Sequence, residues 1–325
     1  MKIDIETKKM PISRVNTASK EQPDTLIERS ESYYKKCVEI ACDSAVEKSK
    51  NIILLTGPSS AGKTTTSNLL CAEFEARGKK AMRISLDDFY KNRDELPFWE
   101  DGSRNYESIE GLDLDCFNRC INELMEKGVA DFPVFDFPTG RVSDKTYEVH
   151  YDNNTFLIFE GIHALNPVFS KMLHVRKCAR IYVSVLSEFI DDDENVIMSS
   201  RNLRLIRRIL RDNSDRATPA DLTLDLWDKV CLGEDKYIRP YRGNADLHID
   251  STLYYEPMVY KKAITRLLKD FKGDKVHKDK FDELLTAVAP FETLPIKMVP
   301  KNSLLREFIS ENQSSDKSSE RPREL

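Results

Sequence analysis

The feature that most constrains the fold of this chain is a glycine-rich loop between an apolar run and a helical stretch. The loop spells G-x-x-x-x-G-K-T from Gly57 to Thr64, after the continuous apolar run "NIILL". The helical pattern then runs from Thr64 to Arg77 and is closed by Gly78. Glycine permits the tight curl that turns backbone amides toward phosphate, and the positive end of the helix points at the same place. The sequence therefore predicts a binding site for a nucleoside triphosphate.

Residue types within this loop indicate how the nucleotide is held. Lys63 brings a mobile cation to the β and γ phosphate oxygens, and Thr64 brings a hydroxyl to Mg²⁺. The motif leaves open whether the end phosphate goes to water, to a protein switch or to a small acceptor. The residues expected to wrap the phosphates are Gly57, Pro58, Ser59, Ser60, Ala61, Gly62, Lys63, Thr64 and Thr65.

Buried runs alternate with helical stretches along most of the chain, which predicts an α/β fold. Four further strands are expected in "KKAMRISLDDFY", "NTFLIFEGIHAL", "ARIYVSVLS" and "NADLHIDST". We predict a three-layer P-loop NTPase fold with a mostly parallel five-stranded sheet. Two alternating runs flank a Pro-Thr-Gly turn in "FPVFDFPTGRVSDKTYEVHY", so we expect a β-hairpin inserted there to bind substrate.

Domain boundaries follow from where the apolar periodicity begins and ends. Residues 1–23 are polar and without a clear period, so a flexible segment is expected. Residues 24–310 should form one kinase domain that opens with a helix over residues 24–50. The tail, residues 311–325, is polar and poor in apolar residues, which predicts disorder.

Composition narrows the class of partner and compartment. The net charge of the 325 residues is −5, so nucleic acid is not the expected partner. We find no apolar run of about 18 residues and no apolar signal region, which predicts neither a membrane span nor secretion. The seven cysteines have no CxxC spacing, and we expect reduced thiols in a cytoplasmic protein.

Acidic residues end two of the predicted strands. Asp87 and Asp88 follow the second strand, and Glu160 ends the run "FLIFE". Ligands of open parallel sheets bind beyond the carboxyl ends of the strands. Asp87 could accept a proton from an attacking hydroxyl or hold a magnesium-bound water, and Glu160 could support the magnesium. The alternatives are a capping aspartate and a solvent-facing acid.

A stripe of arginines marks one helix in "RNLRLIRRILRDNSDR". Arg204, Arg207, Arg208 and Arg211 stand at i, i+3, i+4 and i+7 without an interleaved acid. Like charges at these spacings repel, so we expect the stripe to face a phosphoryl group as an arginine-rich helical lid. A solvated basic face is the alternative. We find no N-K-x-D or H-R-D segment, which disfavours a switch GTPase and a protein kinase.

Six ordered motifs resemble those of the uridine kinases, within the uridine kinase/phosphoribulokinase group. They are "GPSSAGKTT", "SLDDFY", "YESIEGLD", "PVFDF", "FEGIHAL" and "RLIRRILRD". The chain is most similar to the kinase part of the bacterial uridine kinase-like nucleoside kinases, many of which carry an N-terminal domain related to threonyl-tRNA synthetase. The resemblance covers roughly residues 25–310 and implies phosphorylation of a nucleoside 5′-hydroxyl, with ATP as donor and Mg²⁺, in pyrimidine salvage. Uridine kinases are often tetramers, so a homo-oligomer stays open.

The resemblance also assigns roles to individual residues. Asp87 matches the catalytic aspartate, Glu107 falls where uridine kinases keep an aspartate on the ribose, and Arg204 would share that ribose. Tyr90, at the end of "SLDDFY", is a further candidate substrate contact. The remaining assignments are Arg207, Arg208 and Arg211 on the donor phosphates, with Arg207 also catalytic, and Thr64, Asp87 and Glu160 beside magnesium.

One segment departs from the family pattern at the base. Phe135 replaces a tyrosine, and Gly140 stands where a base-reading histidine would be. Arg141 or a backbone group would have to take over that hydrogen bond, so uridine, thymidine, another nucleoside or a broad range all stay open. Two further hypotheses are a kinase acting on a sugar phosphate or a pantothenate-like alcohol, and a nucleotide-binding regulator with little turnover.

Overall fold

The structure is a computed structural model, and it describes residues 7–173, 178–269, 271 and 273–309. Its contacts divide the described chain into two compact units. Unit 1 comprises Tyr33–Leu186 and Leu226–Ser251, and unit 2 comprises Thr7–Ser32, Ser187–Asp225 and the residues from Thr252 on. Each unit is assembled from segments that are distant in the sequence, and the single kinase domain expected over residues 24–310 stays a prediction.

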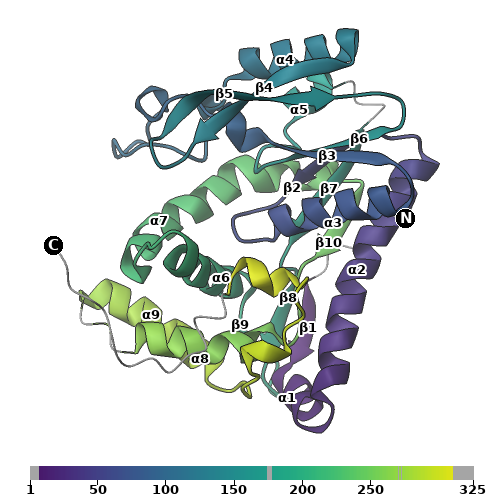
Figure 1. Cartoon of the computed structure of the whole chain (residues 1–325). Coiled ribbons are helices and arrows are strands. Elements are labelled where there is room, and N and C mark those ends of the chain that lie inside the picture. The colour runs from purple at the N-terminus through teal and green to yellow at the C-terminus, as the bar shows by residue number, and fades with distance from the viewer. Residues whose placement is uncertain (1–6, 174–177, 270, 272, 310–325) are drawn as a thin grey trace, which may run out of the picture. The chain divides into compact units, whose positions relative to one another are not determined.

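Unit 1 is built on a parallel sheet of five strands in the order β10-β7-β2-β6-β3 (Figure 1). Every neighbouring pair in this sheet is parallel, which confirms the predicted fold class. The sheet strands are β2 (Ile52–Thr56), β3 (Lys80–Ser85), β6 (Thr155–Glu160), β7 (Cys178–Ser184) and β10 (Leu247–Asp250).

Helices cover both faces of this sheet, which explains why its strands are apolar without alternation. On one face, Phe156 of β6 stacks on Phe74 of α3 (Lys63–Ala76), with ring centroids 4.0 Å apart. On the other face, Phe159 of β6 meets Phe117 of α4 (Leu114–Lys127), with centroids 5.7 Å apart. The short helix α5 (Pro167–Met172) contributes to the same core.

The predicted hairpin consists of β4 (Val129–Asp136) and β5 (Arg141–His150), which pair antiparallel. Gly140 adopts φ +68°, a left-handed conformation that favours glycine, where the turn meets β5. Phe132 of β4 packs edge-on against Phe89, with centroids 5.8 Å apart. This contact joins the hairpin to the short helical turn Leu86–Phe89 that follows β3.

Unit 2 holds a second sheet, of three strands in the order β1-β8-β9. Its strands are β1 (Lys8–Pro11), β8 (Ser187–Ile190) and β9 (Val196–Met198). Its helices include α1 (Ile12–Glu21), α6 (Ser200–Asp215), α8 (Glu256–Leu268) and α9 (Lys275–Val288), whereas α2 (Pro23–Glu47) and α7 (Ala220–Gly233) have residues in both units.

The N-terminal expectation needs a correction within the described residues. Residues 8–21, expected to be flexible, form β1 and α1. Ile12, Val15 and Ser19 are buried at helical spacing, and the side chain of Asn16 bonds the backbone of Pro290 and Glu292 at 2.8 and 2.9 Å. Residues 1–6 and the predicted disordered tail, residues 311–325, lie outside the described residues.

Candidate functional site

The glycine-rich loop joins β2 to α3 at the carboxyl edge of the sheet. A Cβ added to Gly57 would lie 2.0 Å from the carbonyl oxygen of Val183 in β7, so glycine is needed for this close approach. Ser60 and Gly62 have φ of +57° and +87°, and Gly62 is the N-cap of α3. These two left-handed residues turn the chain into the helix, so the phosphate-binding curl predicted from the motif is present.

Hydrogen bonds within the loop hold its shape. The backbone N–H of Ala61 and the Nζ of Lys63 both donate to the carbonyl oxygen of Pro58, each at 3.2 Å. The hydroxyl of Thr66 donates to the carbonyl oxygen of Gly62 at 2.7 Å. Lys63 and Thr64 begin α3, where the first backbone N–H groups of a helix have no partner within the helix. Such a helix start is suited to binding an anion.

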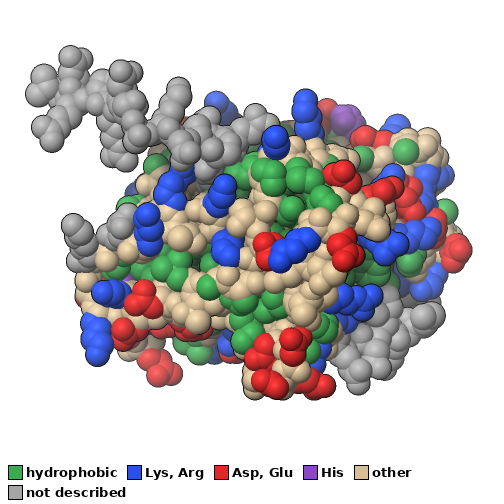
Figure 2. Space-filling view, turned by 90° about the horizontal axis from the view of Figure 1, so that it is seen from below, with side chains coloured by type: hydrophobic (Ala, Val, Ile, Leu, Met, Phe, Trp, Pro, Cys, Tyr) green, Lys and Arg blue, Asp and Glu red, His purple; other side chains and the backbone are tan. Residues whose placement is uncertain are grey.

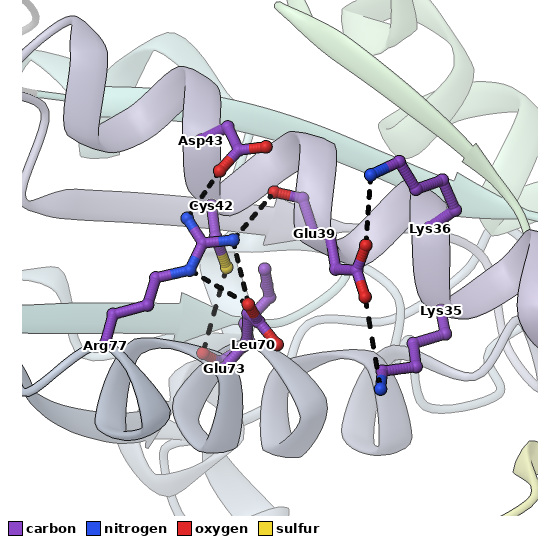
Figure 3. Close-up of polar contacts among 8 residues, drawn as sticks. All are labelled: Lys35, Lys36, Glu39, Cys42, Asp43, Leu70, Glu73 and Arg77. Carbon is purple, nitrogen blue, oxygen red and sulfur yellow. Dashed lines mark hydrogen bonds and ion pairs between the residues drawn. The ribbon is translucent and has the colours of Figure 1, made fainter.

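Polar contacts with α2 fix the orientation of α3 (Figure 3). Arg77 at the C-cap of α3 donates to Glu73 at 2.9 Å and to Asp43 of α2 at 2.7 Å. Near the other end of the helix, the hydroxyls of Tyr34 and Thr66 are 2.7 Å apart. Cys42 lies between the two helices, and burial raises its pKa to about 12. The thiol is therefore protonated and packs as a neutral side chain. The helix that begins at the loop is thus anchored at both ends.

Two of the predicted acids belong to neighbouring strands at this edge. Glu160 ends β6, and its register neighbours are Leu55 in β2 and Ser85 in β3. The glycine-rich loop follows β2, and Asp87 follows β3, so Glu160 lies between the two strands that lead to these features. The Glu160 side chain is 7% exposed and lies 3.2 Å from the guanidinium of Arg83.

The adjacent aspartates Asp87 and Asp88 have different surroundings. Asp88 accepts the backbone N–H of Phe135 at 3.3 Å and the hydroxyl of Tyr147 at 3.5 Å, which ties it to the hairpin. Burial raises the pKa of Asp88 above its ordinary value. The backbone N–H of Asp87 donates to the hydroxyl of Ser85, the cap of this turn. The structure therefore gives Asp88 an anchoring contact with the hairpin, and the role of Asp87 as the base stays a prediction.

Several predicted substrate residues gather beside Asp87. Burial raises the pKa of Tyr90 well above its ordinary value, and the charges of Asp87 and Glu107 raise it further. The Tyr90 ring lies 5.9 Å from that of Phe135, and the Phe137 ring is 5.1 Å from Phe135. The hydroxyl of Tyr90 donates to the carbonyl oxygen of Tyr106. Tyr90, Glu107 and Phe135 thus form one group in unit 1.

The hairpin turn is in contact with a residue from outside the hairpin, Arg93, that the sequence reasoning missed. A Cβ at Gly140 would lie 2.6 Å from Nε of Arg93, and Arg93 donates to the carbonyl oxygen of Phe137 at 3.2 Å. The space beside Gly140 is therefore filled by Arg93. Arg141, the expected replacement, has a 65% exposed side chain that lies 4.0 Å from Asp94. No local pattern pairs residue 93 with residue 140, so only the folded hairpin reveals the contact.

The arginine stripe of α6 belongs to unit 2, and its chemistry differs from the expectation. The guanidinium of Arg207 is fully buried and donates to both carboxylate oxygens of Glu256, at 2.7 and 2.8 Å. These two hydrogen bonds pair Arg207 with a carboxylate inside unit 2, and its role on the donor phosphates stays a prediction. Arg208 and Arg211 lie 3.3 and 3.0 Å from Asp212.

Arg204 is also buried, at 2% exposure, between buried leucines on either side in the sequence. The helix therefore buries both its apolar face and part of its basic stripe. The lid itself, and contacts of Arg204, Arg208 and Arg211 with substrate or donor, stay predictions.

Other observations bear on metals, membranes and cysteines. Within the described residues, no group of three or more His, Cys, Asp or Glu side chains could hold a metal ion. No helix in this part of the chain is long and apolar enough to cross a membrane. None of the seven cysteines, all of which are described, forms a disulfide. On the face of the molecule shown in Figure 2, basic and acidic side chains are mixed.

Comparison with known proteins agrees with this arrangement. The family model described as "Phosphoribulokinase / Uridine kinase family" matches residues 52–254. The chain is 30% identical over 199 residues to a uridine kinase of Streptococcus thermophilus (61% of this chain, 84% of the relative). It is 27% identical over 204 residues to a uridine kinase of Bacillus pumilus (62% and 87%). A solved phosphoribulokinase of Rhodobacter spheroides matches with TM-score 0.42 and 21% identity, over 62% of this chain and 70% of that one. The chain belongs to the phosphoribulokinase/uridine kinase family.

Proposed function

We propose that the protein is an ATP-dependent kinase that phosphorylates the 5′-hydroxyl of a nucleoside, giving the nucleoside 5′-monophosphate. The observation that carries the proposal is the strand register, which puts Glu160 between the strand that leads to the glycine-rich loop and the strand that leads to Asp87. Tyr90, Glu107 and Phe135 also support this proposal. The carboxylate of Glu107 could bind the hydroxyls of a sugar, and the rings of Tyr90 and Phe135 could contact a base.

In the proposed reaction, the loop amides and Lys63 bind the donor phosphates, and the carboxylate of Asp87 accepts the proton of the 5′-hydroxyl. The acceptor oxygen then bonds to the γ-phosphorus as the bond to the bridging oxygen of ADP breaks. Positioning and charge stabilisation supply most of the catalysis in such transfers.

Magnesium fits the residues at this edge. Thr64 and Glu160 offer a hydroxyl and a carboxylate, which are donors that Mg²⁺ accepts. Because the described residues include no group of three or more His, Cys, Asp or Glu side chains that could hold a metal ion, phosphate oxygens and water would complete the coordination. Mg²⁺ would neutralise charge on the donor phosphates.

The test is ADP formation against a panel of nucleosides, with sugar phosphates and pantothenate as control acceptors. Asp87→Asn should lower kcat by about 10²- to 10⁴-fold while ATP binding persists. Asp88→Asn is the matched control, since its amide oxygen can still accept the N–H of Phe135, and its kcat should stay within a few-fold of wild type. Equal turnover of Asp87→Asn and wild type would refute the assignment of Asp87 as the base. If wild type turns over none of the acceptors, the hypothesis of a nucleotide-binding regulator with little turnover is favoured.

A second candidate is phosphorylation of a sugar phosphate. It is favoured by the guanidinium of Arg93 beside the hairpin turn, because guanidinium groups bind phosphate through paired hydrogen bonds. Turnover on a sugar phosphate and on none of the nucleosides would select this candidate.

A further inference from the structure

A short π-helix, Glu234–Ile238, follows α7 in unit 1. π-Helical turns are rare and are frequently found at functional sites. The ring of Tyr237 in this turn packs against two aromatic residues, with centroids 6.1 Å from Trp99 and 6.2 Å from His163. The π-helix is thereby fixed to the loops that follow β3 and β6.

Gly233, at the junction of α7 and the π-helix, lies directly against Glu107. A Cβ added to Gly233 would lie 2.4 Å from both Cβ and Cγ of Glu107 and 3.1 Å from its Oε2. Real Cβ atoms essentially never come within 3.0 Å of such a neighbour, so any larger residue at position 233 must displace the Glu107 side chain. The absence of a side chain at Gly233 therefore sets the path of this carboxylate.

The backbone of Glu107 is held by a second group from the same network. The N–H of Glu107 donates to Oδ1 of Asn105, and Nδ2 of Asn105 donates to the hydroxyl of Tyr237, both at 3.0 Å. Asn105 is 3% exposed, so water competes little with these bonds. One asparagine thus links the backbone of Glu107 to the π-helix that supports its side chain.

A buried histidine completes the support. His163 is 2% exposed, and its ring centroid lies 6.2 Å from that of Tyr237. Burial lowers the pKa of His163 to about 4, so the ring is neutral at physiological pH. A neutral ring packs against Tyr237 without adding a buried charge next to Glu107.

We propose that Gly233, Asn105 and Tyr237 are positioning residues that aim the Glu107 carboxylate at a pair of adjacent hydroxyls on the acceptor. The proposal rests on the proposed function, in which Glu107 belongs to the acceptor site. A carboxylate accepts hydrogen bonds from hydroxyls, and hydrogen bonds to charged groups are about twice as strong as neutral ones. The π-helix is thus a determinant of preference for a vicinal diol over a deoxy analogue.

The test compares Gly233→Ala with Gly243→Ala. Gly243 is a matched control, because a Cβ there would meet no atom within 4 Å and its φ is not left-handed. KM and kcat are measured for the best ribonucleoside of the panel and for its 2′-deoxy analogue. In Gly233→Ala, we expect the KM for the ribonucleoside to rise about tenfold or more, with the KM for the deoxy analogue and for ATP nearly unchanged. Gly243→Ala should match wild type.

An unchanged ratio of kcat/KM between the two acceptors in Gly233→Ala would overturn the proposal. If that variant unfolds, Tyr237→Phe removes only the hydroxyl that bonds Asn105, and we expect a fall of about threefold in the same ratio. Failure of the proposed function is seen separately, as wild type that turns over no nucleoside. Hydrogen exchange of residues 105–110 then tests the positioning contact by itself: faster exchange in Gly233→Ala than in Gly243→Ala supports the role of Gly233 in holding Glu107, and equal exchange overturns it.

Discussion

Replacing Glu256 by glutamine should destabilise unit 2 through the loss of one buried charge. Both Arg207 and Glu256 have side chains with 0% exposure, and two hydrogen bonds of 2.7 and 2.8 Å join them. Glu256 also accepts the backbone N–H of Leu253 at 2.9 Å. In Glu256→Gln, the Arg207 cation stays buried without its counter-charge, and an amide NH₂ replaces one of its acceptors.

The expected loss in the free energy of unfolding is about 3–5 kcal/mol, the range for breaking a buried pair on one side. Replacing both partners, as in Arg207→Met with Glu256→Leu, removes the two charges together and should recover most of that loss. Glu292→Gln is the control, because the Glu292–Lys20 pair is 2.8 Å long with side chains 41% and 65% exposed. An exposed pair contributes at most about 1 kcal/mol.

Urea denaturation followed by far-UV circular dichroism measures these differences, with hydrogen exchange of α6 and α8 as a local probe. Both tryptophans, Trp99 and Trp227, belong to unit 1, so their fluorescence reports that unit separately. A loss in Glu256→Gln no larger than that in Glu292→Gln would refute the reasoning. The double variant also tests the role predicted for Arg207: a large increase in the KM for ATP would support a contact with the donor phosphates, and a KM near that of wild type would contradict it.

Three further predictions concern the loop, the sheet and pH. Lys63→Ala should weaken ATP binding by about 10- to 100-fold in calorimetric titration, because a charge-assisted hydrogen bond to phosphate is lost; unchanged affinity would contradict the loop assignment. Gly57→Ala should lower the melting temperature more than Gly243→Ala does, since its Cβ would meet the Val183 carbonyl at 2.0 Å. Burial lowers the pKa of His163 to about 4. Between pH 6.5 and 4 the unfolded chain therefore binds more protons than the folded chain. As the pH is lowered through this window, the free energy of unfolding should fall by up to about 3 kcal/mol, and the fall should be smaller in His163→Phe.

The local parts of the site could be predicted from the sequence because their signals are contiguous. The strand, glycine-rich loop and helix around Lys63 occupy neighbouring positions, and each residue type there has a backbone or charge requirement of its own. The hairpin around its Pro-Thr-Gly turn is predictable for the same reason.

Contacts between distant segments could not be predicted in this way. No acid stands between the arginines of α6, whereas the partner of Arg207 is Glu256, 49 positions later at the start of α8. The contact of Arg93 with Gly140 and the contact of Gly233 with Glu107 are likewise non-local. Short strands such as β1 carry too few residues for a periodic signal, so their pairing is set by the partner strand.

Strand order is the non-local property on which the candidate site most depends. The chain runs β2, β3, β6, yet β6 lies between β2 and β3 in the sheet. The connections that leave β2 and β6 therefore lead to opposite sides, since α3 leads to β3 on one side and the chain after β6 leads to β7 on the other. Such a switch point opens a crevice at the carboxyl edge of the sheet, where ligands of parallel α/β folds bind. The register puts Glu160 at this point, so an exchange of β3 and β6 in the sheet would set β3 directly beside β2 and remove Glu160 from its place between the loop and Asp87.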